Sequence, residues 1–138
     1  MEAIKYGPGV WFSIHLLALN AQDTCSKKVF IKYMERLKET FPCAKCRKHM
    51  ERYMNANPIQ EFWDKENGFF KWSWIFHNAV NIRLGKKFLD YEEALNLYTD
   101  NIIACNKGCD ESSSIELVYN KPNKRQVPRN YYIPNMYK

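Results

Sequence analysis

Two cysteines three positions apart, Cys43 and Cys46, carry the clearest chemical signal in the sequence. They stand where a helical pattern begins, with Lys45, Arg47 and Lys48 beside them. A helix N-terminus and neighbouring cations both favour the thiolate over the thiol. The thiolate is the species that attacks disulfides, and two cysteines at this spacing can close a small disulfide. The pair therefore indicates redox chemistry.

Two other interpretations of this pair stay open on the motif alone. A CxxC pair is also half of a zinc site, which His49 or His77 would complete. In that case the chain would be a zinc-stabilised helical binding module whose basic surface meets nucleic acid. Alternatively, Cys43 and Cys46 are inert buried thiols. Thioredoxin-like chemistry is not indicated, because no strand or βαβ pattern surrounds the motif.

A second signal is a mixture of aromatic and polar residues on single helical faces. One such face is formed by His77, Val80, Asn81 and Leu84, at positions i, i+3, i+4 and i+7. An earlier segment repeats the pattern with Trp11 and His15. Polar groups on an apolar face need hydrogen-bond partners once they are buried. A lone histidine there is more often part of the core, but two such faces favour a buried heteroaromatic ligand.

The elements that would position these residues are helices. Hydrophobic periodicity predicts five of them, at about residues 8–20, 26–40, 43–55, 69–84 and 91–105. Pro8 suits the opening turn of the first helix, and Gly85 suits the end of the fourth. No run alternates with period two before residue 115, so we expect an all-α helix bundle. We expect one domain over residues 1–109 and an extended, irregular polar tail over 110–138.

Composition narrows the class of protein further. The chain has 138 residues, of which 46% are hydrophobic, and its formal net charge is +6. A basic balance favours anionic partners, either nucleic acid or a phosphate-bearing cofactor. No stretch approaches the ~20 apolar residues of a membrane span, and no targeting sequence is visible. The five cysteines do not form a disulfide scaffold, and we expect Cys25 to be buried and unreactive.

Three segments together resemble the Erv/ALR family of FAD-linked sulfhydryl oxidases. They are residues 7–15 (GPGVWFSIH), residues 42–46 (PCAKC) and residues 72–86, which contain HNAVNIRLGK. The match in order and separation covers about residues 5–105. The resemblance implies a four-helix bundle plus a short fifth helix, usually a homodimer, with FAD at the mouth of the bundle. It implies no metal, no nucleic-acid partner and no membrane span.

The resemblance also implies roles for individual residues. Cys46 matches the cysteine nearest the flavin, and Cys43 matches the one that exchanges with dithiols of protein substrates. Electrons then pass through FAD to molecular oxygen, which yields hydrogen peroxide. The positions that match FAD-binding residues are Gly7, Trp11, His15, Trp72, His77, Asn78, Val80, Asn81, Leu84 and Lys86, with His49 and Tyr53 as weaker candidates. The basic residues Arg83, Lys86 and Lys87 are candidates to meet the pyrophosphate.

The sequence departs from the family's pattern near the ends. Cys105 and Cys109 are spaced differently from a family shuttle disulfide, so a shuttle, an inter-subunit link and plain thiols all stay open. A compact core without a targeting arm looks like the versions carried by large cytoplasmic DNA viruses. That likeness implies a place in the host cytoplasm or the virion. The mitochondrial intermembrane space and the secretory pathway are the alternatives.

Overall fold

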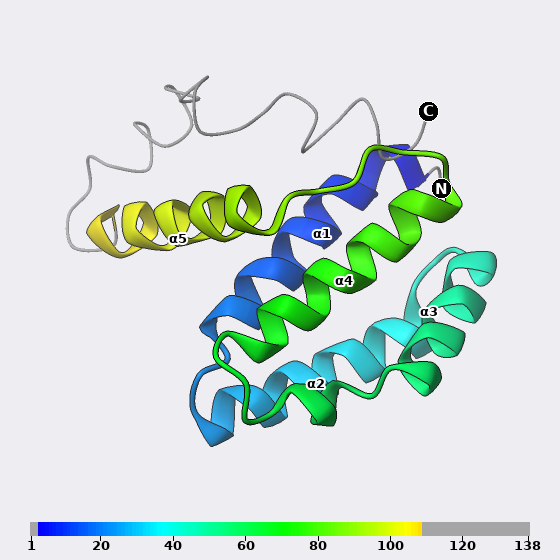
Figure 1. Cartoon of the computed structure of the whole chain (residues 1–138). Helices are drawn as coiled ribbons and strands as arrows, with labels where there is room; N and C mark the ends of the chain where they lie inside the picture. The colour runs from blue at the N-terminus through cyan, green and yellow to red at the C-terminus, as the bar shows by residue number, and fades with distance from the viewer. Residues whose placement is uncertain (1–2, 109–138) are drawn as a thin grey trace.

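The computed structural model describes residues 3–108 and the side chains of residues 7–100. Within that part the chain is helical and contains no strand, which confirms the all-α prediction (Figure 1). The elements are α1 (Ala3–Asn20), α2 (Thr24–Thr40), α3 (Ala44–Ala56), the 3₁₀ helix η1 (Ile59–Phe62), α4 (Gly68–Arg83) and α5 (Tyr91–Gly108). No helix within 3–108 is both long enough and apolar enough to cross a membrane.

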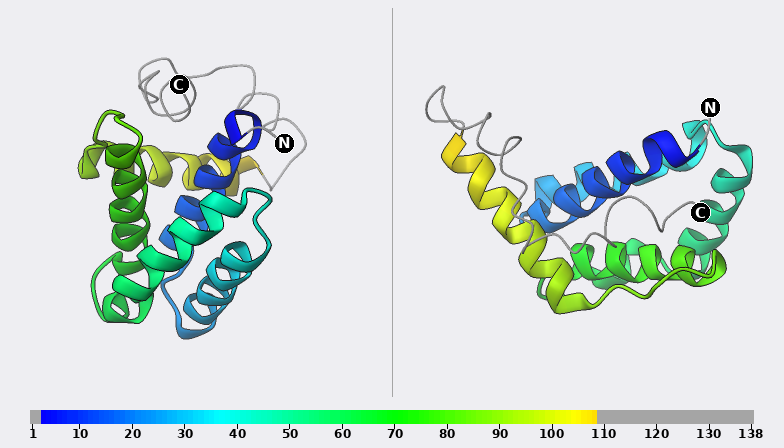
Figure 2. Two further views of the ribbon diagram at one scale, coloured as in Figure 1. Left: turned by 90° about the vertical axis from the view of Figure 1, so that its right-hand side faces the viewer. Right: turned by 90° about the horizontal axis from the view of Figure 1, so that it is seen from above.

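The four helices α1 to α4 form the bundle, and α5 lies across it. Helix α1 packs along α4, α2 packs against both α3 and α1, and η1 packs against α4. Helix α5 contacts both α1 and α4 and crosses them at a steep angle (Figure 2). At 18 residues it is as long as α1, so the fifth helix is not the short one that was expected. The predicted domain limit at residue 109 and the predicted tail lie outside the described residues.

Helix ends follow local chemistry, with one exception. The side chain of Asp23 caps α2, because its Oδ1 accepts the backbone N–H of Ser26 at 2.9 Å. Gly85 ends α4 with a φ of 68°, as the Gly85 prediction requires, and Lys86 N–H donates to the carbonyl of Asn81 at 2.7 Å. The prediction that Pro8 opens the first helix is wrong, since α1 begins at Ala3 and contains Pro8.

The start of α4 depends on a close backbone approach at Gly68. A Cβ at this position would overlap the carbonyl oxygen of Phe62, in η1. The preceding residue, Asn67, has a left-handed φ of 47°. The turn therefore needs glycine to bring η1 against α4. No helix was predicted between residues 55 and 69, so η1 was missed, although Ile59 within it is buried.

A cluster of aromatic side chains fills the core between α4 and its neighbours. Trp72 is completely buried, and its Nε1 donates a hydrogen bond to the carbonyl of Asn57 at 2.8 Å. This bond ties the middle of α4 to the end of α3. The largest fully buried side chains are Trp72, Tyr98, Phe30, Phe69 and Phe70. They hold α4 against the other helices of the bundle and fix the faces that it shows to α1 and α3.

Leu89, in the segment between α4 and α5, is bound by two side chains of α4. Asn78 accepts the Leu89 N–H at 2.7 Å through Oδ1 and donates to the Leu89 carbonyl at 3.1 Å through Nδ2. Trp74 Nε1 donates to the same carbonyl at 2.8 Å. Asn78 and Leu89 are both buried. The Asn78 side chain thus bonds both backbone groups of Leu89, and it holds in place the chain that leads into α5.

We predict that Asn78→Ala lowers the free energy of unfolding by about 1–3 kcal/mol, because the buried N–H of Leu89 loses its acceptor. The measurement is urea denaturation followed by circular dichroism. Asn96→Ala is the matched control, since Asn96 is exposed on α5; its effect should stay within about 0.5 kcal/mol. Equal losses in the two variants would contradict the role given to Asn78.

Candidate active site

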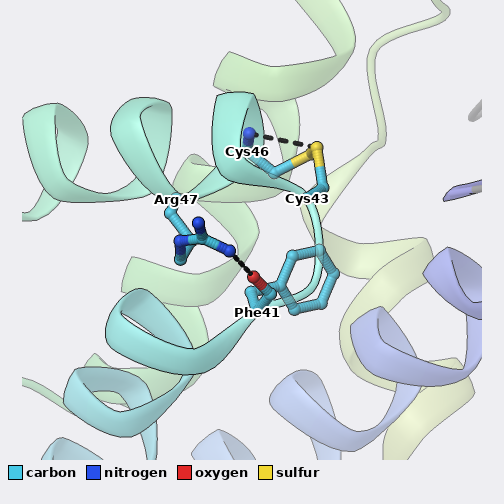
Figure 3. The surroundings of a disulfide bond; sticks show 4 residues. All are labelled: Phe41, Cys43, Cys46 and Arg47. Atoms are coloured by element: carbon cyan, nitrogen blue, oxygen red, sulfur yellow. Dashed lines mark hydrogen bonds between the residues drawn. A yellow bond between two sulfur atoms is a disulfide. The ribbon is translucent and has the colours of Figure 1, made fainter. Parts of the chain in front are cut away.

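Cys43 and Cys46 form a disulfide at the start of α3, with their Cα atoms 5.2 Å apart (Figure 3). Cys43 is the N-cap residue of this helix, and its sulfur accepts the backbone N–H of Cys46 at 3.2 Å. Both side chains are half-buried. A disulfide at the positive end of a helix dipole is placed so that opening it leaves stabilised thiolate.

Arg47 holds the turn that carries Cys43. Its guanidinium donates a hydrogen bond back to the carbonyl of Phe41, the residue that ends α2 (Figure 3). The backbone N–H of Phe41 in turn donates to the carbonyl of Leu37 at 2.9 Å, within α2. The short connection between α2 and α3 is therefore fixed at both ends. This gives Arg47 a structural task that its charge alone did not suggest.

A cavity of about 510 Å³ opens beside the disulfide, with walls from α1, α3 and α4. Its volume lies within the range of small-molecule sites. Six of the predicted site residues line it: Gly7, Trp11, Cys46, His49, Val80 and Leu84. Cys46 is one of the residues that line the cavity, and Cys43 is not. That difference matches the order of roles that the family resemblance implies.

Seven further residues line the cavity. Arg83 had been suggested only for a pyrophosphate, and the other six were not predicted: Val10, Ile14, Phe41, Lys45, Met50 and Phe76. Helical spacing could have found most of them. Val10 and Ile14 stand one and two turns after Gly7 on α1, and Phe76 stands one turn before Val80 on α4. Lys45 stands one turn before His49 on α3, so only Phe41, in the connection between α2 and α3, lacked such a signal.

The other predicted residues do not line the cavity: Cys43, His15, Tyr53, Trp72, His77, Asn78, Asn81 and Lys86. Trp72 and Asn78 already have hydrogen-bond partners in the fold. His77 lies directly behind the wall, since its ring stacks on Trp11 at 4.0 Å with an angle of 4°. Tyr53 stacks in the same way on the lining residue Phe76, at 4.5 Å and 21°.

Two histidines form a buried pair behind this wall. His15 Nε2 lies 2.8 Å from His77 Nδ1, and His15 Nδ1 lies 2.9 Å from the hydroxyl of Ser73. Burial lowers the pKa of His15 to about 3. Burial also lowers the pKa of His77 well below its usual value, and the nearby His15 and Lys86 add to this effect. Both imidazoles are therefore neutral at physiological pH.

Two buried polar atoms at this site have no hydrogen-bond partner among the described side chains and backbone, namely Tyr53 Oη and His77 Nε2. Burial raises the pKa of Tyr53 to about 12, so its phenol keeps its proton. An unpartnered buried polar atom costs about 1–3 kcal/mol, so each is suited to a partner from a bound molecule. Polar atoms of this kind around an apolar cavity are typical of ligand sites.

The lining side chains also match the chemistry of FAD. Aromatic and aliphatic side chains suit a flat ring system, and Trp11, Phe41 and Phe76 are the large aromatic residues of the lining. Lys45 and Arg83 bring positive charge, and neither is ion-paired with an acid in the described part of the chain. Burial lowers the pKa of Arg83, but a guanidinium stays charged at neutral pH. The residues present therefore fit a planar, phosphate-bearing cofactor.

The zinc alternative finds no support at this site. Cys43 and Cys46 are joined to each other, and His77 is hydrogen-bonded to His15. Among the side chains that the structure describes, those of residues 7–100, no three His, Cys, Asp or Glu converge as metal ligands would. The expectation for Cys25 was wrong: this thiol is exposed in the first turn of α2, away from the cavity. The side chains of Cys105 and Cys109 lie outside the described residues.

The chain is similar to known proteins over most of its length. The profile of the Erv1 / Alr family matches residues 8–102. A FAD-linked sulfhydryl oxidase of African swine fever virus is 33% identical over 103 residues, which cover 72% of this chain and 85% of the viral protein. A protein of Acanthamoeba polyphaga mimivirus named "Probable FAD-linked sulfhydryl oxidase" is 28% identical over 99 residues, 69% of each chain. The rice protein Sulfhydryl oxidase 1 is 29% identical over 64% of this chain but only 17% of its own length. No solved structure matches the chain significantly.

We predict that stability falls in acid because His15 and His77 are buried neutral. Their folded pKa values lie below the unfolded value, so below about pH 6.5 the unfolded chain binds protons that the folded chain does not. The free energy of unfolding should drop by up to about 1.4 kcal/mol per pH unit for each histidine. Urea midpoints between pH 7 and pH 5, at fixed FAD concentration, measure this slope. A double His15→Gln/His77→Gln variant should lose it; an equal slope in that variant would assign the effect to other groups.

Proposed function

The chain belongs to the Erv1 / Alr family, and from this premise we propose how its residues carry out the reaction of a FAD-dependent thiol oxidase. The enzyme joins thiols of its substrates into disulfides and delivers the electrons to molecular oxygen, which becomes hydrogen peroxide. One observation carries the assignment of roles: of the two disulfide cysteines, Cys46 alone lines the aromatic cavity. Cys43 is then the sulfur that exchanges with substrate.

The exchange step uses the electrostatics of the α3 start. A substrate thiolate attacks the sulfur of Cys43, which forms a mixed disulfide and releases Cys46 as a thiolate. The N-terminus of α3 and the nearby Lys45 stabilise that negative charge. A second substrate thiolate then attacks the mixed disulfide at the substrate's sulfur. The substrate leaves as a disulfide, and Cys43 and Cys46 stay behind reduced, holding two electrons.

The second half of the cycle takes place at the cavity wall. When bound, FAD accepts two electrons from the dithiol and passes them to molecular oxygen. Cys46 is the donor because its side chain reaches the cavity. As Cys46 gives up its electrons, Cys43 closes on it again, which restores the disulfide at the 5.2 Å Cα separation of the resting pair. Arg47 keeps the Cys43 turn in place for this closure.

The remaining residues hold the cofactor in this proposal. The apolar walls from α1 and α4 enclose the ring system, and Lys45 and Arg83 neutralise the pyrophosphate. Tyr53 Oη and His77 Nε2 offer hydrogen bonds to polar atoms of FAD. Trp72 and Asn78 support the site through the fold, since both side chains are bonded to backbone atoms. His15 acts through His77 in the same supporting way.

The wider setting follows from the relatives. Relatives from large DNA viruses favour a role in the host cytoplasm or the virion, where protein thiols are the substrates. We also propose that the chain works as a homodimer, as the family resemblance implies. One oxidase domain would cover residues 1–109, with the polar tail of residues 110–138 as an appendage.

We predict that the purified protein is yellow, with the absorption bands of bound oxidised flavin. With dithiothreitol it should consume one oxygen molecule and release one hydrogen peroxide for each disulfide formed, as measured with an oxygen electrode and a peroxidase assay. Chelation by EDTA should not change the rate. Colourless protein that contains one zinc ion per chain would contradict the proposal and favour the binding module.

We predict that the two cysteine variants differ in their spectra. Cys43→Ser leaves Cys46 as a thiolate at the cavity wall, so a long-wavelength charge-transfer band should appear beside the flavin bands. Cys46→Ser should show no such band, and both variants should lose nearly all dithiothreitol oxidation. Cys25→Ser is the control, because its exposed thiol lies outside the cavity; it should keep activity and an ordinary spectrum. A band found only in Cys46→Ser would reverse the roles.

A further inference from the structure

A run of four hydrogen-bonding groups crosses from α4 to α1 and back. It begins at the backbone carbonyl of Phe70, to which the Ser73 hydroxyl donates at 2.7 Å. It continues from Ser73 to His15 Nδ1 at 2.9 Å, and from His15 Nε2 to His77 Nδ1 at 2.8 Å. Every side chain in it is at most 2% exposed, so water does not interrupt the run.

The first contact fixes the direction of all the others. A carbonyl oxygen only accepts, so the 2.7 Å contact between Ser73 and Phe70 requires the single hydroxyl hydrogen of Ser73. The Ser73 oxygen is then left as an acceptor toward His15. His15 Nδ1 must therefore carry a hydrogen, and it donates that hydrogen to Ser73.

The same reasoning passes the direction on to His77. A neutral imidazole carries one hydrogen, so His15 with its hydrogen on Nδ1 has a bare lone pair on Nε2. The 2.8 Å contact between the rings then needs a hydrogen on Nδ1 of His77. A second proton on either ring is opposed by their complete burial. His77 Nε2 is left with a lone pair and no hydrogen.

The free atom at the end of the run is one of the two unpartnered polar atoms of the site. His77 Nε2 is buried and has no partner within the described residues. Its neighbours on α4, Phe76 just before it and Val80 one turn later, both line the cavity. His77 itself stacks on the lining residue Trp11 at 4.0 Å, so its lone pair lies directly behind the cavity wall and lacks a hydrogen-bond donor from the described part of the chain.

We propose that Ser73 fixes the tautomers of His15 and His77, so that His77 Nε2 is a hydrogen-bond acceptor that selects an O–H or N–H group of the bound cofactor. This inference rests on the proposed function for the identity of the cofactor, but not for the tautomers. In FAD the matching groups are the ribityl and ribose hydroxyls, the adenine amine and the ring N–H of the flavin. Phosphate oxygens and flavin carbonyls do not match, because they also only accept.

Ser73 is a positioning residue in this scheme, because it acts through His15 and His77. In Ser73→Ala, His15 loses the acceptor that held its hydrogen on Nδ1. The pair can then adopt the reverse arrangement, with His15 donating to His77 and a hydrogen on His77 Nε2. That arrangement turns a donor toward the donor of the cofactor. Alanine suits a helix and adds no volume, so the fold should survive the change.

The test reads the tautomers directly by NMR of the FAD-loaded protein with ¹⁵N-labelled histidine. We expect both His15 and His77 to carry hydrogen on Nδ1 and none on Nε2. Nuclear Overhauser effects from the His77 ring to ribityl, ribose or adenine hydrogens then identify which part of FAD supplies the donor. Ser73→Ala should show mixed or reversed tautomers and bind FAD roughly tenfold more weakly, since a buried acceptor loses its partner.

Ser13→Ala is the matched control, because Ser13 is exposed on α1; it should keep both tautomers and the wild-type affinity. Hydrogen on His77 Nε2 in the wild-type protein would overturn the inference, as would Ser73→Ala with wild-type tautomers and affinity. In Lys86→Met, the His77 Nε2 resonance should keep its hydrogen-bonded position. If this resonance instead moved to the position of an imidazole nitrogen without a hydrogen bond, Lys86 would be the donor, and the role of FAD would be overturned. A flavin-free protein with the expected tautomers would reject the proposed function but keep the tautomer assignment.

Discussion

Buried polar groups need hydrogen-bond partners, and the rest of this structure depends on that constraint. Helix α4 places Ser73, His77, Asn78 and Asn81 in a core made mostly of aromatic and aliphatic side chains. Each position has a cost unless another element supplies a partner. Through Ser73 and His77, α4 is bound to His15 of α1. Through Asn78, it is bound to the chain that leads into α5. The polar stripe thus specifies the arrangement of three helices that hydrophobic packing alone would leave less defined.

A second, local constraint sets the reactive end of the site. Cys43 is the N-cap residue of α3 and has no side-chain oxygen, so its sulfur accepts the backbone N–H of Cys46 in the first turn. The same residue, Cys43, therefore caps the helix and forms the disulfide. Arg47, one residue beyond the pair, ties it to the end of α2. Reactivity and stability at this point come from the same few bonds, and α3 turns Cys46 toward the cavity.

Sequence analysis predicted the five helices and the reactive pair because both depend on local patterns. The resemblance to the Erv/ALR family also implied that residues of α1, α3 and α4 share one site. Periodicity did not settle which of two adjacent residues faces the ligand, since neighbours on a helix differ by only about 100°. On α4, Phe76 lines the cavity and His77 lies behind it. Phe41 was missed because it lies in the connection between α2 and α3, and Lys45 because it was considered only as a cation beside the cysteines. Cys25 was misjudged because nothing in its neighbours reveals that it is exposed.

A backbone carbonyl of α4 sets the direction of the hydrogen bonds that lead to the site. Phe70, Ser73 and His77 are spaced by three and four residues, so they share one face of the helix. The carbonyl of Phe70 accepts a hydrogen bond and cannot donate one. Each later hydrogen bond in the run must therefore point in the same direction as the one before it. The protonation of a histidine at the cavity is therefore decided two turns away, by a group that cannot titrate. Because no group in this run has to change its charge, the arrangement holds across the neutral pH range in which thiolates react.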